Sequence, residues 1–312
     1  MIAFQATPLS DDAYVLGEGP VWDSLRQRLL WVDIIAGKVF AGRLDPFTID
    51  QEWSFDGMVG AVAVSAEGAL LVAEQETLTR VDPDGGRTPL ARVLPAGGGS
   101  RLNDGAVDPE GRFLIGSMSL TDVTGATGEL LARFEGGKLI TIDHDLTLSN
   151  GLAWVGDRLY SIDSIPRVIY GRDYPKGPRP KGPGPNDPAP NGPHPNGPRP
   201  TGPRPTGPRE ELFRVAGGLP DGMCADRDGN LWIAVHGAGR VECRTPAGDL
   251  RAVVELDSPQ PTSVAFAGPG LDILVITSAT EGLDPVPPNA GRIFTCRVHT
   301  AGLPTPYWNP AL

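Results

Sequence analysis

Five polar side chains of this sequence lie in short glycine-containing motifs, most of them followed by an apolar run. They are Glu18 in LGEGPVWD, Arg101 and Asn103 in RLNDGAV, Asn150 in SNGLAW and Asp221 in PDGMCA. Glycine allows a backbone to approach another group closely, so a carboxylate or amide held beside it is either part of a turn or a ligand aimed at a fixed point. Which interpretation holds depends on whether the fold brings these distant motifs together.

The residue types in these motifs predict a site for a hard divalent cation. Glu18, Asn150 and Asp221 all offer side-chain oxygen atoms, which Ca²⁺, Mg²⁺ and Mn²⁺ prefer as ligands. No histidine or cysteine stands at these three positions, which argues against a structural zinc site.

Each motif taken alone has a simpler interpretation. Asn150 with its following glycine and Asp221 between proline and glycine are both common turn sequences. Arg101 has a potential ion-pair partner in Asp104. The site interpretation is favoured because similar residues recur at equivalent places along the chain.

The motifs belong to a longer internal repeat, in which two strand-like runs flank a turn such as DPEG or DRDG. Alternating apolar residues in GRFLIGSM and NLWIAV fit β-strands and not helices. The six repeats begin at Gly17, Val59, Asn103, Ser149, Pro220 and Pro261. Corresponding residues lie 41 to 47 positions apart, except for a step of 71 between Asn150 and Asp221. This period is typical of four-stranded propeller blades, which span about 40 to 50 residues.

The long step contains a low-complexity tract at residues 176–210. It consists of seven pentapeptides, from KGPRP to TGPRE, and without these 35 residues the step falls to 36. Proline lacks an amide donor and fixes φ, so we expect a disordered, polyproline-II-like insert in one blade. The insert is either a tolerated surface expansion or a docking segment for a proline-recognising or acidic partner.

These features predict an all-β fold, a six-bladed β-propeller that residues 1–312 form as a single domain. Closing the ring leaves few open strand edges, although the sequence leaves open which terminal strand closes it. In such a ring the start of each blade's first strand faces the central channel. The five polar residues named above would then converge on one axis, and because buried charges need partners or a metal, their convergence favours a site.

Composition limits the partners and the location. The net charge of −11 argues against a nucleic-acid partner. No run approaches the roughly 20 apolar residues of a membrane span, and the start MIAFQATPLSDDAY does not read as a signal peptide. Cys224, Cys243 and Cys296 are too widely spaced for a zinc or disulfide pattern. We therefore expect buried, reduced thiols in a soluble cytoplasmic protein of unknown oligomeric state, without nucleic-acid or membrane partners.

Together the motifs resemble those of the gluconolactonase family that includes senescence marker protein (regucalcin). The matching segments are LGEGPVWD, RLNDGAVDPEGRFLIGSM, SNGLAW, YSIDS, PDGMCADRDGNLWIAV, GAGRV and PTSVAF. They follow the family's order and similar spacing over nearly the whole chain, apart from the pentapeptide tract. The resemblance implies a six-bladed propeller with one divalent cation in its channel, and lactonase activity on sugar-acid lactones.

Carried over position by position, the resemblance implies that Glu18, Asn150 and Asp221 are the cation ligands. Asp221 is also the family's usual candidate for the general base, and Arg101 and Asn103 match substrate-contacting positions. The cation stays open among Ca²⁺, Mg²⁺, Mn²⁺, Zn²⁺ and Fe²⁺. An acidic substrate contact that some members carry before a GALY strand has no clear counterpart in TDVTGATGELLARF, so the choice of lactone is open.

The expected reaction is hydrolysis of a five- or six-carbon lactone, such as a glucono-, xylono- or arabinolactone, to its aldonic acid. The cation would polarise the carbonyl, Asp221 would assist the attacking water, and Arg101 would stabilise developing negative charge. One alternative is a non-catalytic propeller that binds Ca²⁺ or a partner. Another is a related hydrolase of organophosphates or aromatic lactones, for which the sequence shows little apolar lining.

Overall fold

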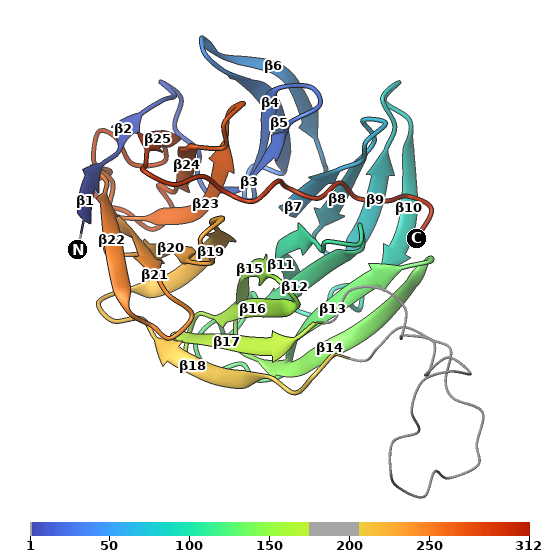
Figure 1. Cartoon of the computed structure of the whole chain (residues 1–312). Coiled ribbons are helices and arrows are strands. Elements are labelled where there is room, and N and C mark those ends of the chain that lie inside the picture. The colour runs from blue at the N-terminus through green and yellow to red at the C-terminus, as the bar shows by residue number, and fades with distance from the viewer. Residues whose placement is uncertain (1, 175–205) are drawn as a thin grey trace, which may run out of the picture.

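The computed structural model describes residues 2–174 and 206–312, which form a ring of six β-sheets (Figure 1). The described residues contain strands, turns and bends but no helix, and no helix among them is long and apolar enough to cross a membrane. The predicted six-bladed propeller is therefore confirmed. Most of the predicted insert, residues 176–205, lies outside the described residues.

Each blade runs outward from the channel through an inner, a second, a third and an outer strand. The inner strands are β3 (Gly17–Asp23), β7 (Val59–Val64), β11 (Ser100–Val107), β15 (Ser149–Val155), β19 (Leu219–Ala225) and β23 (Pro261–Ala267). The second strands are β4 (Arg28–Asp33), β8 (Leu70–Glu74), β12 (Phe113–Ser119), β16 (Arg158–Asp163), β20 (Leu231–His236) and β24 (Ile273–Ser278). The predicted repeat starts fall at or within a few residues of the inner-strand starts.

The remaining strands complete the blades on the outside of the ring. The third strands are β5 (Lys38–Leu44), β9 (Thr77–Val81), β13 (Glu129–Glu135), β17 (Val168–Asp173), β21 (Arg240–Arg244) and β25 (Phe294–Arg297). The outer strands are β6 (Phe47–Ser54), β10 (Arg87–Arg92), β14 (Lys138–Leu146), β18 (Glu210–Arg214), β22 (Leu250–Glu255) and β2 (Thr7–Pro8).

The N-terminal residues close the ring. Strand β2 pairs antiparallel with β25, so the outer strand of the sixth blade comes from the beginning of the chain. Strand β1 (Ile2–Gln5) lies parallel to β22 and extends the fifth blade. The closing strand, which the sequence left open, thus couples the fifth and sixth blades through one short segment.

Hydrophobic side chains fill the space between neighbouring blades in six clusters, one for each interface. Trp31 stacks on Phe40 with ring centroids 5.4 Å apart, where the first blade meets the sixth. Trp232 meets Phe266 edge to face at 5.8 Å, where the fifth blade meets the sixth. Alternate residues of each strand face opposite neighbours, which explains why most residues of the second strands are apolar and buried.

Short side chains stabilise the turns between inner and second strands. Asp108 accepts hydrogen bonds from the backbone N–H groups of Glu110 and Arg112, at 2.9 and 3.0 Å. Asp226 accepts equivalent bonds in the fifth blade, and Ser65 does so in the second. These contacts are the physical reason for the recurring DPEG-like and DRDG-like turns.

The last pentapeptide of the predicted tract, residues 206–210, is described and belongs to the fourth blade. Glu210 begins β18. Arg209 donates two hydrogen bonds to Asp145, at 2.7 and 2.8 Å, and its guanidinium lies 4.7 Å from the Tyr170 ring centroid. Regular blade structure therefore resumes inside the tract, before its predicted end at residue 210.

The C-terminal strap, residues 302–309, crosses the end of the channel at which the inner strands finish (Figure 1). Gly302 bridges to Asp226 of the fifth blade, whereas the Trp308 N–H donates to the Val64 carbonyl of the second blade at 2.9 Å. Trp308 is buried in the cluster between the second and third blades. The strap therefore connects opposite sides of the ring.

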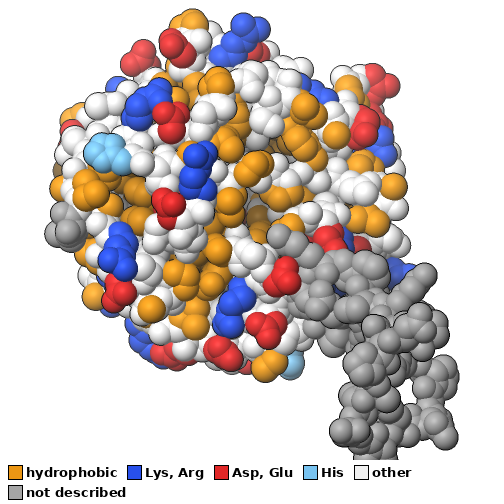
Figure 2. All heavy atoms as spheres, viewed as in Figure 1, with side chains coloured by type: hydrophobic (Ala, Val, Ile, Leu, Met, Phe, Trp, Pro, Cys, Tyr) orange, Lys and Arg blue, Asp and Glu red, His pale blue; other side chains and the backbone are white. Residues whose placement is uncertain are grey.

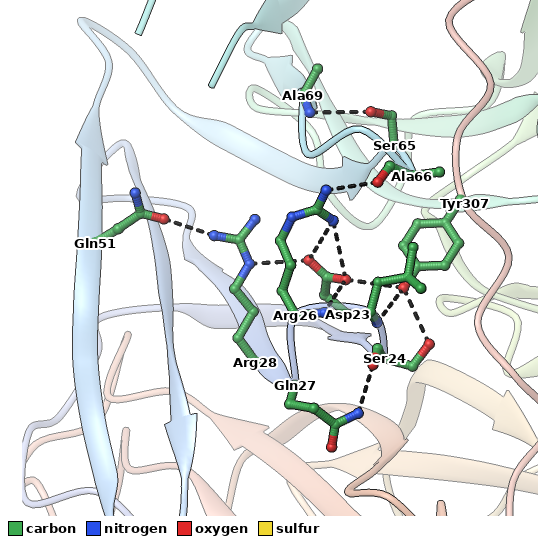
Figure 3. A network of polar contacts seen from close by, with 11 residues as sticks. Asp23, Ser24, Arg26, Gln27, Arg28, Gln51, Ser65, Ala66, Ala69 and Tyr307 are labelled. Atoms are coloured by element: carbon green, nitrogen blue, oxygen red, sulfur yellow. Dashed lines mark hydrogen bonds and ion pairs between the residues drawn. The ribbon is translucent and has the colours of Figure 1, made fainter. Parts of the chain in front are cut away.

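A polar network attaches the strap to the first blade (Figure 3). The Tyr307 hydroxyl donates to Asp23 at 3.0 Å and accepts a hydrogen bond from the Leu25 N–H at 2.8 Å. Asp23 is fully buried and also pairs with Arg26 and Arg28. This buried carboxylate is thus neutralised by two guanidinium groups, as a buried charge requires.

Candidate active site and cation-binding centre

A ring of backbone irregularities positions the predicted site residues. Each inner strand shifts its register against its second strand at the same level, so every blade carries a β-bulge there. Glu18 and Asn150 are the last residues paired before their bulges, whereas Asn103 and Asp221 lie within theirs. A bulge re-aims side chains at a strand edge, which lets several blades present polar groups to the axis.

The turn interpretation of two motifs is wrong. Asn150 and Gly151 lie inside β15, and Asp221 and Gly222 lie inside β19. Gly151 has a positive φ of 20° and Gly19, after Glu18, one of 51°, conformations that glycine adopts with little strain. Glycine therefore serves the bulges at these positions.

Hydrogen bonds connect two of the predicted residues directly. Asn103 donates from Nδ2 to Asn150 Oδ1 at 2.8 Å and to the Ser149 carbonyl at 2.9 Å. Asn150 in turn donates to Ser164 Oγ at 2.8 Å, and Ser164 donates to the Pro220 carbonyl at 2.6 Å. This relay links the third, fourth and fifth blades and fixes the Asn150 amide, whose oxygen keeps a second lone pair.

Ser164 is a site residue that the sequence reasoning missed. It is buried, with 1% exposure, and follows directly after β16. The motif YSIDS that contains it contributed to the family resemblance without suggesting a role for its second serine. Its function depends on a contact with the next blade, which only the folded ring reveals.

Arg101 is buried, and one of its guanidinium nitrogens donates hydrogen bonds to residues of its own strand. Its Nη1 donates to the Leu102 carbonyl at 3.1 Å and to Asn103 Oδ1 at 2.6 Å. The alternative ion pair with Asp104 does not occur among the described residues, since Asp104 instead accepts the Gly105 N–H at 2.7 Å. Arg101 thus helps to hold Asn103 within the site.

Three carboxylates of the inner strands, Glu18, Asp104 and Asp221, act on one another electrostatically and disfavour one another's charge. Burial raises the pKa of Glu18 well above its usual range, and the charges of Asp221 and Asp104 raise it further. Burial, followed by the charge of Asp104, raises the pKa of Asp221 in the same direction. Burial also raises the pKa of Asp104 to about 6. Asp221 and Asp104 keep some exposure because they line channel space, but protein surrounds them on the other sides.

The donor set fits a hard divalent cation. The described residues contain no group of three Asp, Glu, His or Cys side chains placed to hold a metal ion. The predicted set of Glu18, Asn150 and Asp221 has only two residues of these types, and its third donor is the amide oxygen of Asn150. All three donors are oxygens, and the mutual repulsion of the buried carboxylates is the electrostatic condition that a bound cation relieves. The arrangement is therefore suited to Ca²⁺, Mg²⁺ or Mn²⁺ in preference to a thiolate-binding metal.

An apolar cavity of about 400 Å³ lies between the bulges and the C-terminal strap. Its wall includes Val62, Leu152, Met223 and Phe266, and residues 303–306 of the strap contribute to it. Figure 2 shows hydrophobic side chains gathered around the middle of this face. The sequence suggested little apolar lining, and the structure corrects this: the lining exists, on the strap side of the polar level.

The remaining nucleophile and base candidates have structural roles. Cys224 packs against the cluster between the fifth and sixth blades, and burial raises the pKa of its thiol. Burial lowers the pKa of His236, which ends β20. In the 121–128 loop, Asp122 accepts the Gly125 N–H and so stabilises its own loop. None of these contacts assigns the three residues to the reaction.

The fold and the site together define a six-bladed propeller with a polar, acid-lined channel of the kind found in sugar lactonases. The family model described as the SMP-30/gluconolactonase/LRE-like region matches residues 16–280, and the chain belongs to this family. Regucalcin from Xenopus laevis is 33% identical over 284 residues, covering 88% of this chain and 86% of the relative. A 6-deoxy-6-sulfogluconolactonase from Pseudomonas putida is 31% identical over 309 residues, covering 94% of each.

A solved structure shares the same fold. The calcium-binding protein regucalcin from Agrobacterium tumefaciens superposes with a TM-score of 0.85 and 23% identity over 99% of each chain. At this identity the similarity establishes the propeller architecture.

Proposed function

We propose that this protein hydrolyses sugar-acid lactones of five or six carbons to aldonic acids with the help of one divalent cation. The proposal is supported by the position of Glu18, Asn150 and Asp221 at or within the bulges of three inner strands. Asn103 donates to Asn150, and the charges of Glu18 and Asp221 act on Arg101. Membership in the SMP-30/gluconolactonase family supports it, as does the similarity to a 6-deoxy-6-sulfogluconolactonase from Pseudomonas putida.

Glu18, Asn150 and Asp221 would hold the cation. When bound, it would supply Lewis-acid polarisation of the lactone carbonyl, worth several kcal/mol on the order of magnitude. The chain prepares this position by burying two repelling carboxylates beside an amide oxygen that Asn103 and Ser164 orient. Groups of this kind around ligands are expected to tune both affinity and orientation.

Asp221 would orient the attacking water and accept its proton. The carboxylate lies in the channel, and both burial and the charge of Asp104 raise its pKa. A bound cation beside this carboxylate would keep it ionised, so that it could accept a proton from a water that the cation polarises.

Arg101 and Asn103 would bind the lactone. In the described part of the chain, Nε and Nη2 of Arg101 form no hydrogen bond, so these donors are available to ring hydroxyls and to the oxyanion. Asn103 retains its hydrogen bond to Asn150 while it lines the same level. The apolar cavity on the strap side adds a wall of low polarity beside this level, which strengthens these electrostatic interactions.

The test is proton release from a panel of aldonolactones, measured before chelation, after chelation and after return of Ca²⁺, Mg²⁺, Mn²⁺, Zn²⁺ or Fe²⁺. Spontaneous hydrolysis is subtracted with heat-denatured protein. We expect turnover that chelation abolishes and at least one cation restores. Equal turnover with and without chelator would contradict the role of the cation, whereas cation binding without hydrolysis of any lactone would favour a non-catalytic propeller.

A further inference from the structure

A loop of the sixth blade places an additional carboxylate at the mouth of the channel. The connection between β24 and β25, residues 279–293, lies on the face where the inner strands begin, because Ser278 pairs with Pro261 at the start of β23. Within it, Ala279 bridges to Leu16, and the Glu281 N–H donates to the Val15 carbonyl at 3.0 Å. The loop is therefore fixed directly beside the strand that carries Glu18.

The backbone of Glu281 is held from two sides while its side chain stays exposed. With its side-chain nitrogen turned toward the loop, Gln260 donates to the carbonyl oxygens of Glu281 and Ala279, at 3.1 and 3.3 Å. In the described part of the chain the Glu281 carboxylate has no hydrogen-bond or ion-pair partner, and the residue is exposed. Such a residue presents a free carboxylate at a fixed position on the rim.

The Glu281 carboxylate acts electrostatically on Arg101, a residue of the opposite blade. Among the charges that act on the buried Arg101 guanidinium, Glu281 has the largest influence, ahead of Glu18 and Asp221. Arg101 is only 5% exposed and leaves Nε and Nη2 without partners in the described chain. The loop anchored at Val15 and Leu16 thus brings a free carboxylate to the rim from which it acts on the partly unpaired Arg101 guanidinium, an arrangement suited to a polyol with vicinal hydroxyls.

The charge balance of the site limits which polyol fits. Glu281, Glu18 and Asp221 act on the Arg101 guanidinium, and Asp104 acts on Glu18 and Asp221. With these four carboxylates, one guanidinium and a single divalent cation, the fully ionised site would carry about one excess negative charge. An additional anion on the ligand is therefore disfavoured, because the interaction of like charges in a partly desolvated channel is screened incompletely.

We propose that Glu281 is a substrate-binding residue that accepts hydrogen bonds from the hydroxyls of an uncharged aldonolactone, to which Arg101 donates, and that it selects against lactones with a second acidic group. This inference rests on the proposed lactonase function and specifies its substrate class.

The decisive variant is Glu281→Gln, which keeps the shape and removes the charge. The matched control is Asp12→Asn, an exposed aspartate in the segment that leads into the same rim and does not act on Arg101. The substrates are D-glucono-1,4-lactone and D-glucaro-1,4-lactone, which differ by one carboxylate at C6. For binding without turnover, calorimetric titrations use glucuronamide and glucuronate, measured on the cation-loaded protein.

In the wild type we expect kcat/KM to be higher for the gluconolactone. In Glu281→Gln, KM for the gluconolactone should rise with kcat little changed, and the preference over the glucarolactone should shrink about 5- to 10-fold, while Asp12→Asn stays within about twofold of the wild type. An unchanged preference in Glu281→Gln, or an equal shift in Asp12→Asn, would overturn the inference.

The titrations with glucuronamide and glucuronate test the role of Glu281 independently of lactone hydrolysis. If the wild type hydrolyses no lactone but binds glucuronamide more tightly than glucuronate, and Glu281→Gln narrows that difference, the lactonase proposal fails and the assignment of Glu281 stands. If the wild type binds neither sugar, or prefers the anion, the assignment is wrong.

Discussion

Asn103 and Asn150 lie 47 positions apart in the sequence, and the Nδ2 of the first donates to the Oδ1 of the second at 2.8 Å. This bond joins the bulges of the third and fourth blades. It links a residue assigned to the lactone with one assigned to the cation, so the two binding functions share a single amide–amide contact.

Removing the Asp221 carboxylate should abolish turnover. We expect Asp221→Asn to lower kcat about 10²- to 10⁴-fold, because the variant loses both the proton acceptor and a cation ligand. Urea unfolding should show little loss of stability, since one of three repelling carboxylates is gone. Asp122→Asn, on the 121–128 loop of the same face, is the control and should retain its activity; an active Asp221→Asn would refute the proposed role.

Ser164 should influence cation affinity without touching the cation. Ser164→Ala leaves the buried Nδ2 of Asn150 without its acceptor, and we expect about tenfold weaker cation binding and about 1–3 kcal/mol lower free energy of unfolding. Calorimetry and urea denaturation measure the two effects. The control is Ser161→Ala, a buried serine of β16 whose side chain has no hydrogen bond in the described structure; equal effects in both variants would argue against the relay.

The three thiols should resist modification in the native protein. Burial raises the pKa of Cys224 and of Cys296, and raises that of Cys243 to about 12. The thiolate is the reactive form, so a thiol reagent at neutral pH should label almost nothing until urea unfolds the chain, when three groups become reactive. Cys224 is less buried than the other two and lines the cavity, so rapid native labelling there would contradict this expectation.

His236 should contribute to sensitivity to mild acid. Burial lowers its pKa in the folded state, below the value of about 6.5 in the unfolded chain. As pH falls through that value, the unfolded state takes up a proton that the folded state resists, so the free energy of unfolding should decrease. His236→Gln should flatten the decrease between about pH 7 and the lowered folded pKa, and exposed His144→Gln should leave its slope unchanged in parallel urea titrations.

The Tyr307 hydroxyl should stabilise the strap. Tyr307→Phe removes the bonds to Asp23 and to the Leu25 N–H, and we expect a loss of about 1 kcal/mol with faster hydrogen exchange at the Trp308 N–H. Ser24→Ala, which removes only the exposed Ser24–Tyr307 contact, should have a smaller effect. Unchanged exchange in Tyr307→Phe would mean that packing of Trp308 alone secures the strap.

Sequence reasoning succeeded where a feature repeats. Six alternating runs with equivalent polar starts predicted the six inner strands and the blades of Glu18, Asn150 and Asp221, because a period of this length is a property of the chain itself. The same reasoning could not distinguish a turn from a bulge at Asn150, since glycine after asparagine serves both, and the choice depends on pairing with β16.

The features that were missed depend on contacts between blades. Ser164 donates to a carbonyl of the next blade, and Glu281 acts on Arg101 in the opposite blade. The ring closes where Thr7 pairs with Thr295. None has a local signature, because each partner lies far away in sequence and becomes a neighbour only when the ring closes. The strap is similar: AGLPTPYWNP reads as an irregular tail until Trp308 enters its cluster.

The six bulges separate reactivity from architecture. Folding depends on the hydrophobic clusters between neighbouring blades. The few residues of each inner strand that are unpaired at the bulge do not belong to these clusters. Exchanging the non-glycine side chains at that level would therefore re-equip the channel for another ester or another ion while the scaffold stays intact. Gly60, Gly151 and Gly222 must be kept, because a Cβ at these positions would collide with neighbouring strands.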